Sequence, residues 1–406
     1  MSNIVKAGFV LSLLVVGCAA AEDGASEDDV VTKPACPSTK PATVAALKAV
    51  AAQAEACGAS APATPNRQRA WTHATSSALI ASARPNHRGR DNFYAEGAPQ
   101  WILGKFSYGL ADKDLKGEQV DIYVQRGCSG AWEELRLSSP AITTQEGEHP
   151  TVEGVEDTGG RIYVQIPEAQ KLGIGHHRVR MVVAGDQSFA EQTIEVLPKG
   201  TPLFVSDVDG TLTERKPDDP QLVCDEESDF PALWRSLWES GAQPNVHEGA
   251  AAVLQKLAEA GYRPLYLTAR PEWLVPHTHA FLRGESRRDG RGNLPQGVVQ
   301  TTLGLTGAFN GAAEAFKKEA VKSVIAKGFK PVFGFGNRPS DVATYGDSGV
   351  PFAFYFENLD THARSCSKVT DLTLLSPGST LSRGNWRIRS YDDVMPRVAG
   401  LSPVCR

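Results

Sequence analysis

From Pro202 onward, short apolar segments typical of buried strands alternate with segments of helical character. The strand segments read PLFVS, RPLYLT, GVVQT, PVFGFG and PFAFYF, and helices are expected at about 249–260, 313–327 and 340–346. Apolar strands separated by helices form a parallel sheet that is covered on both faces. The pattern therefore predicts an α/β domain with a Rossmann-like parallel sheet over residues 200–406.

Two carboxylates follow the first of these strands, in the sequence SDVDGT. Asp207 and Asp209 are placed to face one pocket, and Gly210 permits a sharp exit from the strand. Because carboxylates so close together repel each other, they favour a bound cation. Asp207 is a candidate nucleophile that attacks phosphorus, and Asp209 is a candidate acid for the leaving oxygen and base for water.

Phosphate-holding groups are expected at the ends of the next two strands. The second strand ends in LTARP, where the hydroxyl of Thr268 and backbone N–H groups are suited to phosphate oxygens. Lys317 and Lys318 lie in the helix after the third strand, and one lysine near the phosphate would neutralise charge in the transition state.

The fourth strand ends in GFGNRPSD, which contains two hard oxygen donors. Asn337 and Asp341 are of the ligand type that Mg²⁺ prefers in proteins. Ligands of such sheets bind outside the carboxyl ends of the strands, where all these side chains are expected. The sequence therefore predicts one phosphate and magnesium site at this edge.

The segments DVDGTLT, LTARP and GNRPSDVATY, with a lysine before the last of them, resemble the motifs of the haloacid dehalogenase superfamily of phosphohydrolases. FGNRPSDVATY and YLTARP are most similar to its lipin branch, the Mg²⁺-dependent phosphatidate phosphatases, and to related lipid-transfer-protein domains. The resemblance covers about residues 201–356 and implies a haloacid dehalogenase fold with a small cap.

The resemblance also implies a role for each matching residue. Asp207 would be the nucleophile, Asp209 the general acid and base, and Thr268 and Lys317 would hold the phosphate; Lys317 is preferred to Lys318 because it follows a phenylalanine. Asp207, the backbone carbonyl of Asp209 and Asn337 would bind Mg²⁺, with Asp341 in the first or second coordination sphere. Thr211, Arg270 and Arg338 are expected to contact the substrate.

Two features near these motifs leave the substrate open. The insert at 214–245 is longer than expected for the lipin branch and carries an apolar stripe at helical spacing, of Phe230, Leu233, Trp234, Leu237 and Trp238. The stripe either packs on the domain or faces lipid beside the pocket. The basic stretch at 283–291 is either a solvated loop or a site for an anionic headgroup.

Residues 95–198 show a different pattern, with short alternating segments such as QVDIYVQ and RIYVQIP between turn residues. This pattern predicts an all-β domain, an immunoglobulin-like sandwich, in front of the α/β domain. The adjacent His176 and His177 suggest a metal site, but neighbours on a strand point to opposite faces, which favours separate structural roles.

The first residues resemble a bacterial lipoprotein signal. Lys6 precedes an apolar run at 7–17 that is too short to span a bilayer, and the run ends in VVGC at Cys18. A signal peptide at 1–18, lipidation of Cys18 and a disordered tether at 19–35 are therefore expected, although a plain secretory signal remains the alternative. Ala19 favours the outer membrane of a bacterial cell envelope, on its periplasmic or surface side.

Six further cysteines in an exported chain suggest disulfides. Locality in the sequence favours the pairs Cys36 with Cys57 and Cys366 with Cys405. A short helix is expected at 41–56, followed by a linker at 58–67, so that residues 36–67 form a helical segment and linker.

The net charge of −5 and a pI near 6.0 give no electrostatic footprint for nucleic acid. We expect a membrane-anchored phosphatase that uses Mg²⁺ and acts on phosphatidate or a similar lipid phosphate. Two alternatives stay open: a phosphatase of another envelope phosphomonoester, and a phosphatidate-binding module without turnover.

Overall fold

The computed structural model describes residues 41–57, 61–81, 83–214, 244–285, 289–304, 307, 310–357, 369, 372–376, 379 and 382–401. Within these ranges, no helix has both the length and the apolar character needed to cross a membrane. Several expectations fall outside them, namely Cys18, the tether at 19–35, Cys36, Cys224, the stripe with Trp234 and Trp238, Cys366 and Cys405.

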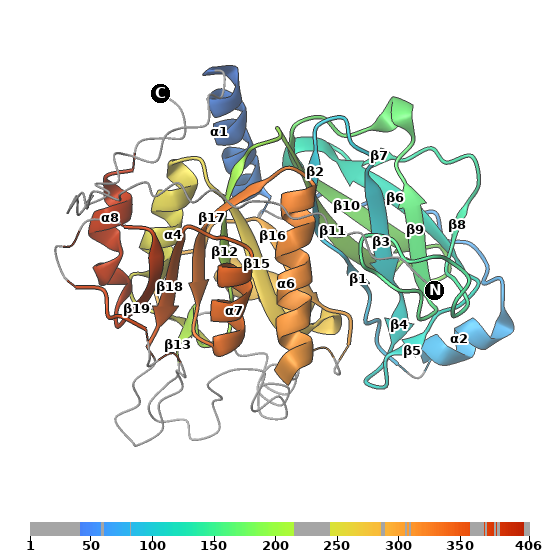
Figure 1. Ribbon diagram of the computed structural model, residues 1–406. Helices are drawn as coiled ribbons and strands as arrows, with labels where there is room; N and C mark the ends of the chain where they lie inside the picture. The colour runs from blue at the N-terminus through green and yellow to red at the C-terminus, as the bar shows by residue number, and fades with distance from the viewer. Residues whose placement is uncertain are drawn as a thin grey trace, which may run out of the picture.

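The N-terminal half of the described chain is a β-sandwich, with helices α1 (Pro41–Ala56) and α2 (Ala74–Ala81) at its edges (Figure 1). One sheet has the order β1 (Arg88–Gly89), β3 (Trp101–Lys105), β9 (Arg161–Gln165). The other has the order β2 (Asn92–Ala95), β11 (Phe189–Leu197), β10 (Gly175–Val183), β6 (Gln119–Gln125), β7 (Glu133–Glu134), and β8 (Ala141–Ile142) also pairs with β6. The strands β4 (Ser107–Tyr108) and β5 (Lys113–Asp114) form a separate pair.

The two sheets bury a shared apolar core. Ile102 of β3 and Ile162 of β9 pack in one cluster with Ile122, Val179 and Ile194 of the second sheet. All five side chains are at most 2% exposed. Alternate residues of each strand thus face the partner sheet, which is the pattern that the alternation in the sequence predicted.

The C-terminal half is built on one six-stranded sheet in which every neighbouring pair is parallel. Its order is β16 (Val298–Thr302), β15 (Arg263–Pro271), β12 (Pro202–Ser206), β17 (Lys330–Gly336), β18 (Phe352–Phe356), β19 (Gly384–Ile388). In chain order this is 3-2-1-4-5-6, the order of the Rossmann fold, and it reverses direction at β12. A site at the carboxyl end of β12 therefore lies at the topological switch point.

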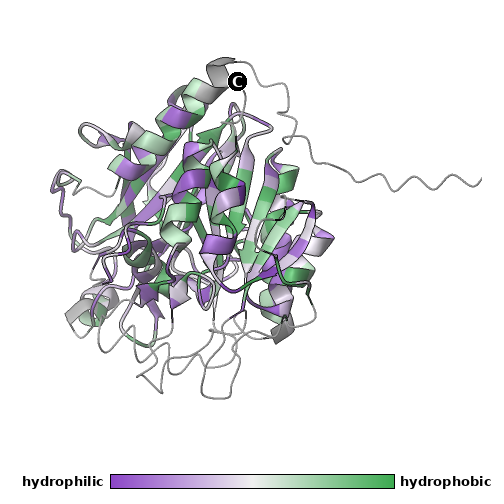
Figure 2. Cartoon of the chain, turned by 90° about the vertical axis from the view of Figure 1, so that its left-hand side faces the viewer, coloured by the Kyte–Doolittle hydropathy of each residue, from purple (hydrophilic) through white to green (hydrophobic). Residues whose placement is uncertain are grey.

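Helices cover both faces of this sheet. On one face, α6 (Asn310–Ala326) and α7 (Pro339–Asp347) share an apolar cluster with Leu203 and Val205 of β12. On the other, α4 (Ala250–Glu259) and α8 (Met395–Ala399) share a cluster with Phe204. Figure 2 shows the hydrophobic residues concentrated on the strands between these helix layers. Two covered faces explain why β12 is apolar at consecutive positions.

The expected fold class is confirmed: an all-β sandwich precedes a Rossmann-like parallel sheet. The three helices expected at 249–260, 313–327 and 340–346 correspond to α4, α6 and α7. The sandwich includes β1 and β2, which lie mostly before the expected boundary at residue 95. Several described elements had no counterpart in the sequence analysis, among them the helices α2, α5 (Val275–Leu282) and α8 and the edge strand β19.

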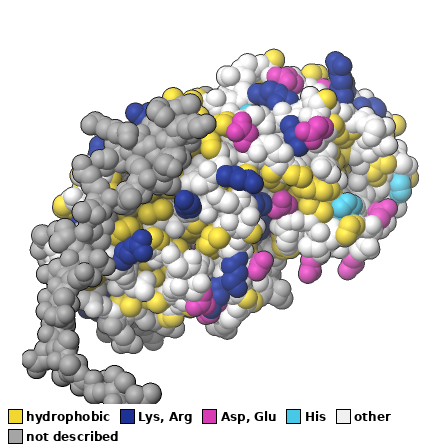
Figure 3. Space-filling model, turned by 45° about the horizontal axis from the view of Figure 1, so that its top comes forward, with side chains coloured by type: hydrophobic (Ala, Val, Ile, Leu, Met, Phe, Trp, Pro, Cys, Tyr) yellow, Lys and Arg dark blue, Asp and Glu magenta, His cyan; other side chains and the backbone are white. Residues whose placement is uncertain are grey.

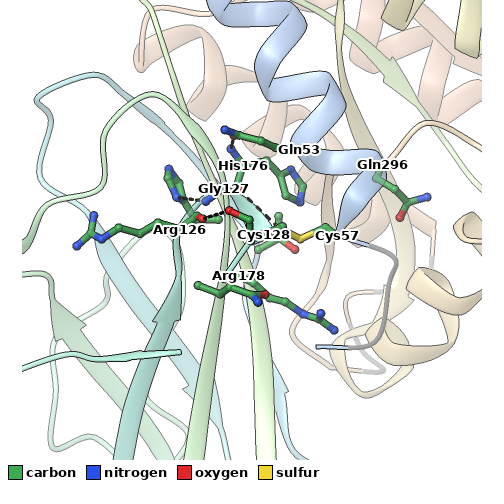
Figure 4. The surroundings of a disulfide bond; sticks show 12 residues. Gln53, Cys57, Arg126, Gly127, Cys128, His176, Arg178 and Gln296 are labelled. Carbon is green, nitrogen blue, oxygen red and sulfur yellow. Dashed lines mark hydrogen bonds between the residues drawn. A yellow bond between two sulfur atoms is a disulfide. The ribbon is translucent and has the colours of Figure 1, made fainter. Parts of the chain in front are cut away.

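Of the two disulfides expected from sequence locality, the pair of Cys36 with Cys57 is wrong, and the pair of Cys366 with Cys405 lies outside the described residues. Cys57 pairs with Cys128, 71 residues further along the chain, and not with Cys36 (Figure 4). Helix α1 packs against the sandwich, where the side-chain carbonyl of Gln53 accepts a hydrogen bond from the backbone N–H of His176 (2.9 Å). This packing brings the end of α1 to the short helix η1 (Arg126–Cys128), so the partner of Cys57 comes from the sandwich.

The histidine pair behaves as structural side chains, as the sequence analysis favoured. Nδ1 of His176 lies 2.6 Å from Oε1 of Glu195, whereas Nε2 of His177 lies 2.8 Å from the carbonyl oxygen of Gly173. Ligand atoms of His176, Cys57 and Cys128 lie within 4.8 Å of one another, but the two sulfurs are joined in the disulfide. Disulfide formation leaves these sulfurs without the thiolate that a metal would need.

Charged side chains of both signs are interspersed over the described part of the face in Figure 3. That face therefore carries no continuous basic surface among the described residues, which agrees with the net charge of −5.

Candidate active site

The end of β12 directs the first motif into the edge of the sheet. The backbone N–H of Asp207 still donates to the carbonyl of Phe335 on β17 (2.9 Å), which extends the pairing one residue past the strand. The chain then turns at Gly210, whose φ of 72° lies in the left-handed region that glycine tolerates. Asp207 and Asp209 are both buried, at 1% and 4% exposure, and they lie on either side of Val208.

Asp207 lies between a lysine and a threonine. Its Oδ1 is 3.2 Å from Nζ of Lys317, which comes from α6, and its Oδ2 accepts a hydrogen bond from the hydroxyl of Thr211 (3.1 Å). Lys317 and Thr211 are at most 1% exposed. The structure therefore brings the expected nucleophile and the expected phosphate-holding lysine together, although they are 110 residues apart in the sequence.

Lys317 also contacts Asp341, the acidic residue in the first turn of α7. Nζ of Lys317 donates to Oδ1 of Asp341 (3.0 Å), and Oδ2 of Asp341 accepts from the backbone N–H groups of Asn337 (3.0 Å) and Arg338 (3.1 Å). Both oxygens of Asp341 are thus engaged in holding Lys317 and the turn between β17 and α7. This arrangement favours a supporting place for Asp341 over direct metal contact.

The hydroxyl of Thr211 lies within hydrogen-bond distance of both Asn337 and Asp207. The hydroxyl oxygen of Thr211 is 3.1 Å from Oδ1 of Asn337 and 3.1 Å from Oδ2 of Asp207. A hydroxyl has one proton, so it serves only one of these two acceptors at a time. The amide nitrogen of Asn337 is buried and has no hydrogen-bond partner among the described residues.

These residues fit a bound Mg²⁺ ion. Oδ2 of Asp207 and Oδ1 of Asn337 each lie 3.1 Å from the hydroxyl oxygen of Thr211, so two hard oxygens of the kind that this ion prefers lie near each other. Three buried carboxylates, Asp207, Asp209 and Asp341, lie at this edge of the sheet with the buried cations Lys317, Arg270 and Arg338. A divalent cation held by Asp207 and Asn337 would reduce the repulsion among the carboxylates.

Asp209 is paired with Arg270, the arginine of LTARP. Nε of Arg270 donates to Oδ2 of Asp209 (2.6 Å) and Nη2 donates to Oδ1 (2.5 Å). Nη1 of Arg270 reaches the hydroxyl of Thr278 (3.1 Å), on the helix α5 (Val275–Leu282). The fully buried guanidinium of Arg270 forms a two-pronged contact with Asp209, and its expected contact with the substrate stays a prediction.

Thr268 and Arg338, the remaining site residues, lie at the same edge. The hydroxyl of Thr268 is 3.3 Å from Oδ2 of Asp209 and accepts the backbone N–H of Arg270 (3.2 Å). Arg338 directly follows Asn337, is 8% exposed and contributes its backbone N–H to Asp341. The structure thus brings together all nine residues that the motifs singled out, from the ends of β12, β15 and β17 and from α6 and α7.

The insert between the first motif and α4 begins and ends beside this site. Strands β13 (Thr213–Glu214) and β14 (Asn245–Val246) pair antiparallel immediately after the DVDGT turn. Arg291, from the basic stretch, donates to Oε2 of Glu214 (2.6 Å). The described end of the basic stretch therefore fixes this two-stranded ribbon.

Glu272 lies two residues beyond Arg270, and the sequence analysis did not single it out. Oε1 of Glu272 accepts hydrogen bonds from Arg161 (2.7 Å) and Arg88 (3.0 Å), both of which belong to the sandwich. Burial alone would raise the pKa of Glu272, but the two guanidinium groups outweigh it and lower the pKa. The end of β15, which carries Arg270, is therefore fixed to the first domain by a buried ion cluster.

Tyr391 was also missed. Its hydroxyl, in the short helix η5 (Tyr391–Asp393), donates to the backbone carbonyl of Thr211 (2.8 Å). Burial raises the pKa of Tyr391 well above its usual value, with a smaller contribution from Asp207. The phenol is therefore neutral and holds the DVDGT turn from behind. No sequence signal marked this residue, since it is 180 positions from Thr211.

Comparison with known proteins assigns each half of the chain. Residues 204–356 match the LNS2 domain of PITM 1-3. That domain is of the lipin-like, haloacid dehalogenase type, so the resemblance found in the motifs is confirmed at the level of the domain. Residues 85–196 match the β-sandwich domain of PITM 1-3. The two domains thus occur here in the order in which the structure describes them.

Three relatives illustrate the similarity. Membrane-associated phosphatidylinositol transfer protein 1 of Rattus norvegicus is 30% identical over 291 residues, which is 71% of this chain and 19% of the relative. Membrane-associated phosphatidylinositol transfer protein 2 of Homo sapiens is 30% identical over 60% of this chain and 15% of the relative. Protein retinal degeneration B of Drosophila melanogaster is 26% identical over 69% of this chain and 19% of the relative.

This chain therefore spans about a fifth of the length of the curated relatives that it matches. These relatives are animal proteins, so they lend no support to the expected bacterial lipoprotein, which stays a prediction.

Proposed function

We propose that this protein is a Mg²⁺-dependent phosphomonoester hydrolase that acts through an aspartyl-phosphate on Asp207, with phosphatidate or a similar lipid phosphate as its substrate. The observation that carries the proposal is the position of Asp207 between Lys317 and Thr211 at the switch point of the sheet. Its carboxylate has a lysine at 3.2 Å that would offset the charge of an incoming phosphate.

In the proposed reaction, an oxygen of Asp207 forms a bond to phosphorus while the bond from phosphorus to the alkoxide oxygen breaks. Asp209 gives a proton to the alkoxide, which leaves as an alcohol. Water then attacks phosphorus and passes a proton to Asp209, and the bond to Asp207 breaks to release phosphate. When bound, Mg²⁺ would reduce the repulsion between the carboxylate and the phosphate.

This sequence of steps requires Asp209 to change partners. Its two oxygens are held at 2.6 and 2.5 Å by Arg270, and a proton can move through Asp209 only when one of these contacts is released. Thr268, at 3.3 Å from Oδ2, is the described side chain placed to keep Asp209 at the site during that exchange. Substrate binding would therefore have to shift Arg270 or the Asp209 side chain.

The lipid part of the proposal is supported by the names of the relatives, which are phosphatidylinositol transfer proteins described as membrane-associated. It is also supported by the match to the LNS2 domain, which is lipin-like. Phosphatidate combines a phosphomonoester with the class of molecule that these proteins handle.

The test is a phosphate-release assay on purified protein, with phosphatidate in mixed detergent micelles and with a soluble aryl phosphate. We expect Mg²⁺-dependent release that stops in EDTA, returns when Mg²⁺ is added, and is absent from Asp207→Asn. Release that persists in metal-stripped protein would remove Mg²⁺ from the mechanism. Release from the aryl phosphate alone would retain the phosphatase and reject the lipid substrate.

One observation favours a second function, a phospholipid-binding module without turnover. Arg270 donates a hydrogen bond to each carboxylate oxygen of Asp209, and in this arrangement Asp209 cannot act as a general acid or base. Such a module would bind phosphatidate vesicles yet release no phosphate in the assay above. Equal vesicle binding by the protein and by Asp209→Asn, with no phosphate release from either, would establish this second function.

For the location of the protein, we propose a lipid anchor at Cys18 that holds it at a bacterial cell envelope, with the outer membrane favoured. The proposal rests on the VVGC sequence after a short apolar run. Cys18→Ala is expected to move the protein out of the membrane fraction and to remove the mass of the acyl chains. An unchanged mass and an unchanged membrane fraction would reject the anchor.

A further inference from the structure

A cavity of about 1330 Å³ lies away from the strand ends, between α2 and the strand pair β4–β5 of the sandwich. Leu79 of α2 and Leu115, just after β5, contribute to its walls, and His277 of α5 reaches it from the second domain. Pockets for small ligands typically have volumes of roughly 300–1,000 Å³, so this cavity is large enough for a lipid-sized molecule.

The wall of the cavity is partly apolar. Leu79, Ala83, Leu110 and Leu115 all line it. Leu110 is 65% exposed, the largest exposure of any large hydrophobic side chain among the described residues. An aliphatic chain seated against these side chains would remove apolar surface from water on both partners.

Basic side chains surround this apolar wall. Arg84 and Lys113 line the cavity, are exposed, and form no ion pair among the described residues. The one acidic residue of the lining, Asp114, is already paired with Lys105 at 2.6 Å and lies 3.9 Å from Lys116. The lining therefore places the basic groups of Arg84 and Lys113 beside an apolar surface. The carboxylate of Glu118, which accepts hydrogen bonds from the lining residues His73 and Ser76, is buried (2% exposed).

We propose that this cavity binds an anionic amphiphile, with its aliphatic chain along Leu79, Leu110 and Leu115 and its acidic headgroup against Arg84 and Lys113. The basic side chains favour an acidic headgroup, and the apolar wall favours an aliphatic chain. The bound molecule could be a membrane lipid or a free acidic lipid, since both present this chemistry. The site is separate from the carboxylates of the candidate active site and does not depend on turnover there.

The cavity is nevertheless adjacent to α5, the helix that Arg270 contacts. His277 lines the cavity, and its neighbour Thr278 accepts a hydrogen bond from Arg270 (3.1 Å). Burial lowers the pKa of His277, and the charge of Arg270 lowers it further, which keeps the imidazole neutral. A molecule bound in the cavity would thus contact the same helix, α5, that holds the partner of Asp209.

The test is calorimetric titration of the full chain with decylphosphonate, a non-hydrolysable anionic amphiphile, in EDTA so that a metal-dependent site stays silent. We expect one molecule bound per chain, with affinity that falls as the salt concentration rises. Methylphosphonate, which lacks the chain, and decyl glucoside, which lacks the charge, are each expected to bind about tenfold more weakly or worse.

Two variants locate the site, and each has a matched control. Leu110→Glu and Lys113→Glu are each expected to weaken decylphosphonate binding about tenfold. Ile325→Glu, at another exposed hydrophobic position (40% exposed), and Lys48→Glu, on the exposed face of α1, are expected to leave it unchanged. Circular dichroism of all four variants confirms that the fold is retained.

Three results would overturn the proposal. These are no binding of decylphosphonate by the full chain, equal binding of decyl glucoside, or binding that Leu110→Glu and Lys113→Glu leave unchanged. Because the measurement is made in EDTA and reads binding alone, failure of the phosphatase proposal does not affect it. Conversely, loss of the cavity proposal leaves phosphate release at Asp207 untouched.

Discussion

The buried carboxylates at the interface between the two domains differ from those at the strand ends. At the interface, Glu195 of β11 accepts from Arg263 (2.6 and 3.1 Å) and contacts His176, and Glu272 accepts from Arg88 and Arg161. Each interface carboxylate thus has at least one full cation of its own. At the strand ends, Asp207 and Asp341 both contact Lys317.

The difference suggests two roles for buried carboxylates. Those at the interface stabilise the packing of the two domains, and those at the strand ends are available to a ligand. A buried carboxylate with a complete set of partners stabilises the arrangement in which it is found, because removing one partner leaves an uncompensated charge. A group of carboxylates with too few cations is stable only with an added cation or a proton. By this criterion Asp209, which accepts two hydrogen bonds from Arg270, resembles the interface carboxylates, whereas Asp207 contacts a lysine that also contacts Asp341.

The largest effect is expected from Asp207→Asn. The change preserves the shape of the side chain but removes the attacking charge, so turnover should fall on the order of 10⁴-fold or more. The free energy of unfolding should change little, because Lys317 keeps its contact with Asp341. Phosphate release and urea unfolding measure the two quantities. A strong loss of stability with retained turnover would show that Asp207 stabilises the fold, as the interface carboxylates do, and does not act in the reaction.

A smaller effect on activity is expected from Asp209→Asn. Loss of a general acid and base typically costs roughly 10²–10⁴-fold in rate, and here the buried Arg270 would also lose its counter-charge. We therefore expect both the rate and the stability to fall, unlike the result for Asp207→Asn. Rates with a soluble aryl phosphate and urea unfolding test this. Unchanged stability would show that the Arg270 contact is not maintained in solution.

For the interface carboxylates, we expect a large loss of stability and only a small loss of activity, the reverse of the result expected for Asp207→Asn. Glu272→Gln leaves Arg161 without its counter-charge, whereas Arg88 keeps Asp112, and should lower the free energy of unfolding by about 3–5 kcal/mol. The exposed Glu259→Gln on α4 is the matched control and should change it by less than about 1 kcal/mol. Phosphate release under native conditions should fall only modestly for either variant. Loss of activity as complete as that of Asp207→Asn would assign Glu272 to the reaction itself.

The lowered pKa of Glu195, at the interface, leads to a prediction of how the free energy of unfolding depends on pH. Burial opposes ionisation of Glu195, but Arg263 and His176 outweigh it and lower its pKa from 4.5 to about 2. A lowered carboxyl pKa contributes stability above the unfolded value, and this contribution is lost as the pH falls from about 4.5 to about 2. The loss is roughly 3 kcal/mol. Glu195→Gln should be less stable at pH 7 and should show less further loss over this range, as measured by urea unfolding.

The smallest effect on activity is expected from loss of the disulfide. Replacing both Cys57 and Cys128 by alanine opens a covalent link across 71 residues and should lower the free energy of unfolding by about 2–4 kcal/mol. Phosphate release should not change, because the link joins α1 to the sandwich. Thermal unfolding of the variant, and of the parent protein with reductant, measures the effect. A reductant that leaves the melting temperature of the parent unchanged would contradict the pairing.

The sequence predicted where the site lies, but it did not predict which side chains of the site pair with each other. Asp207, Thr268 and Asn337 were predicted together because the carboxyl ends of parallel strands meet at one edge. That Arg270 pairs with Asp209 depends on the direction of its side chain, which no linear spacing determines. Glu272 stands directly after LTARP, yet its partners Arg88 and Arg161 lie 184 and 111 residues away. Such contacts are set by domain packing.

The elements that were missed have weak local patterns. Strand β19 reads GNWRI, lies at the edge of the six-stranded sheet beside β18, and is only partly apolar. Helix α2 reads ATSSALIA, a short segment of small residues without strong helical periodicity. The partner of Cys57 was missed for a related reason, because α1 crosses the sandwich and meets a residue that locality could not indicate.

The most direct test of the central claim is to trap phosphate on Asp207. A nitrophenolate leaves without needing a proton, so Asp209→Asn should still be phosphorylated by a nitrophenyl phosphate but should hydrolyse the phospho-enzyme slowly. We predict an initial burst of nitrophenolate close to one equivalent per enzyme, with the added mass of a phosphoryl group on Asp207. The absence of a burst in Asp209→Asn, or phosphate found on another residue, would contradict the account.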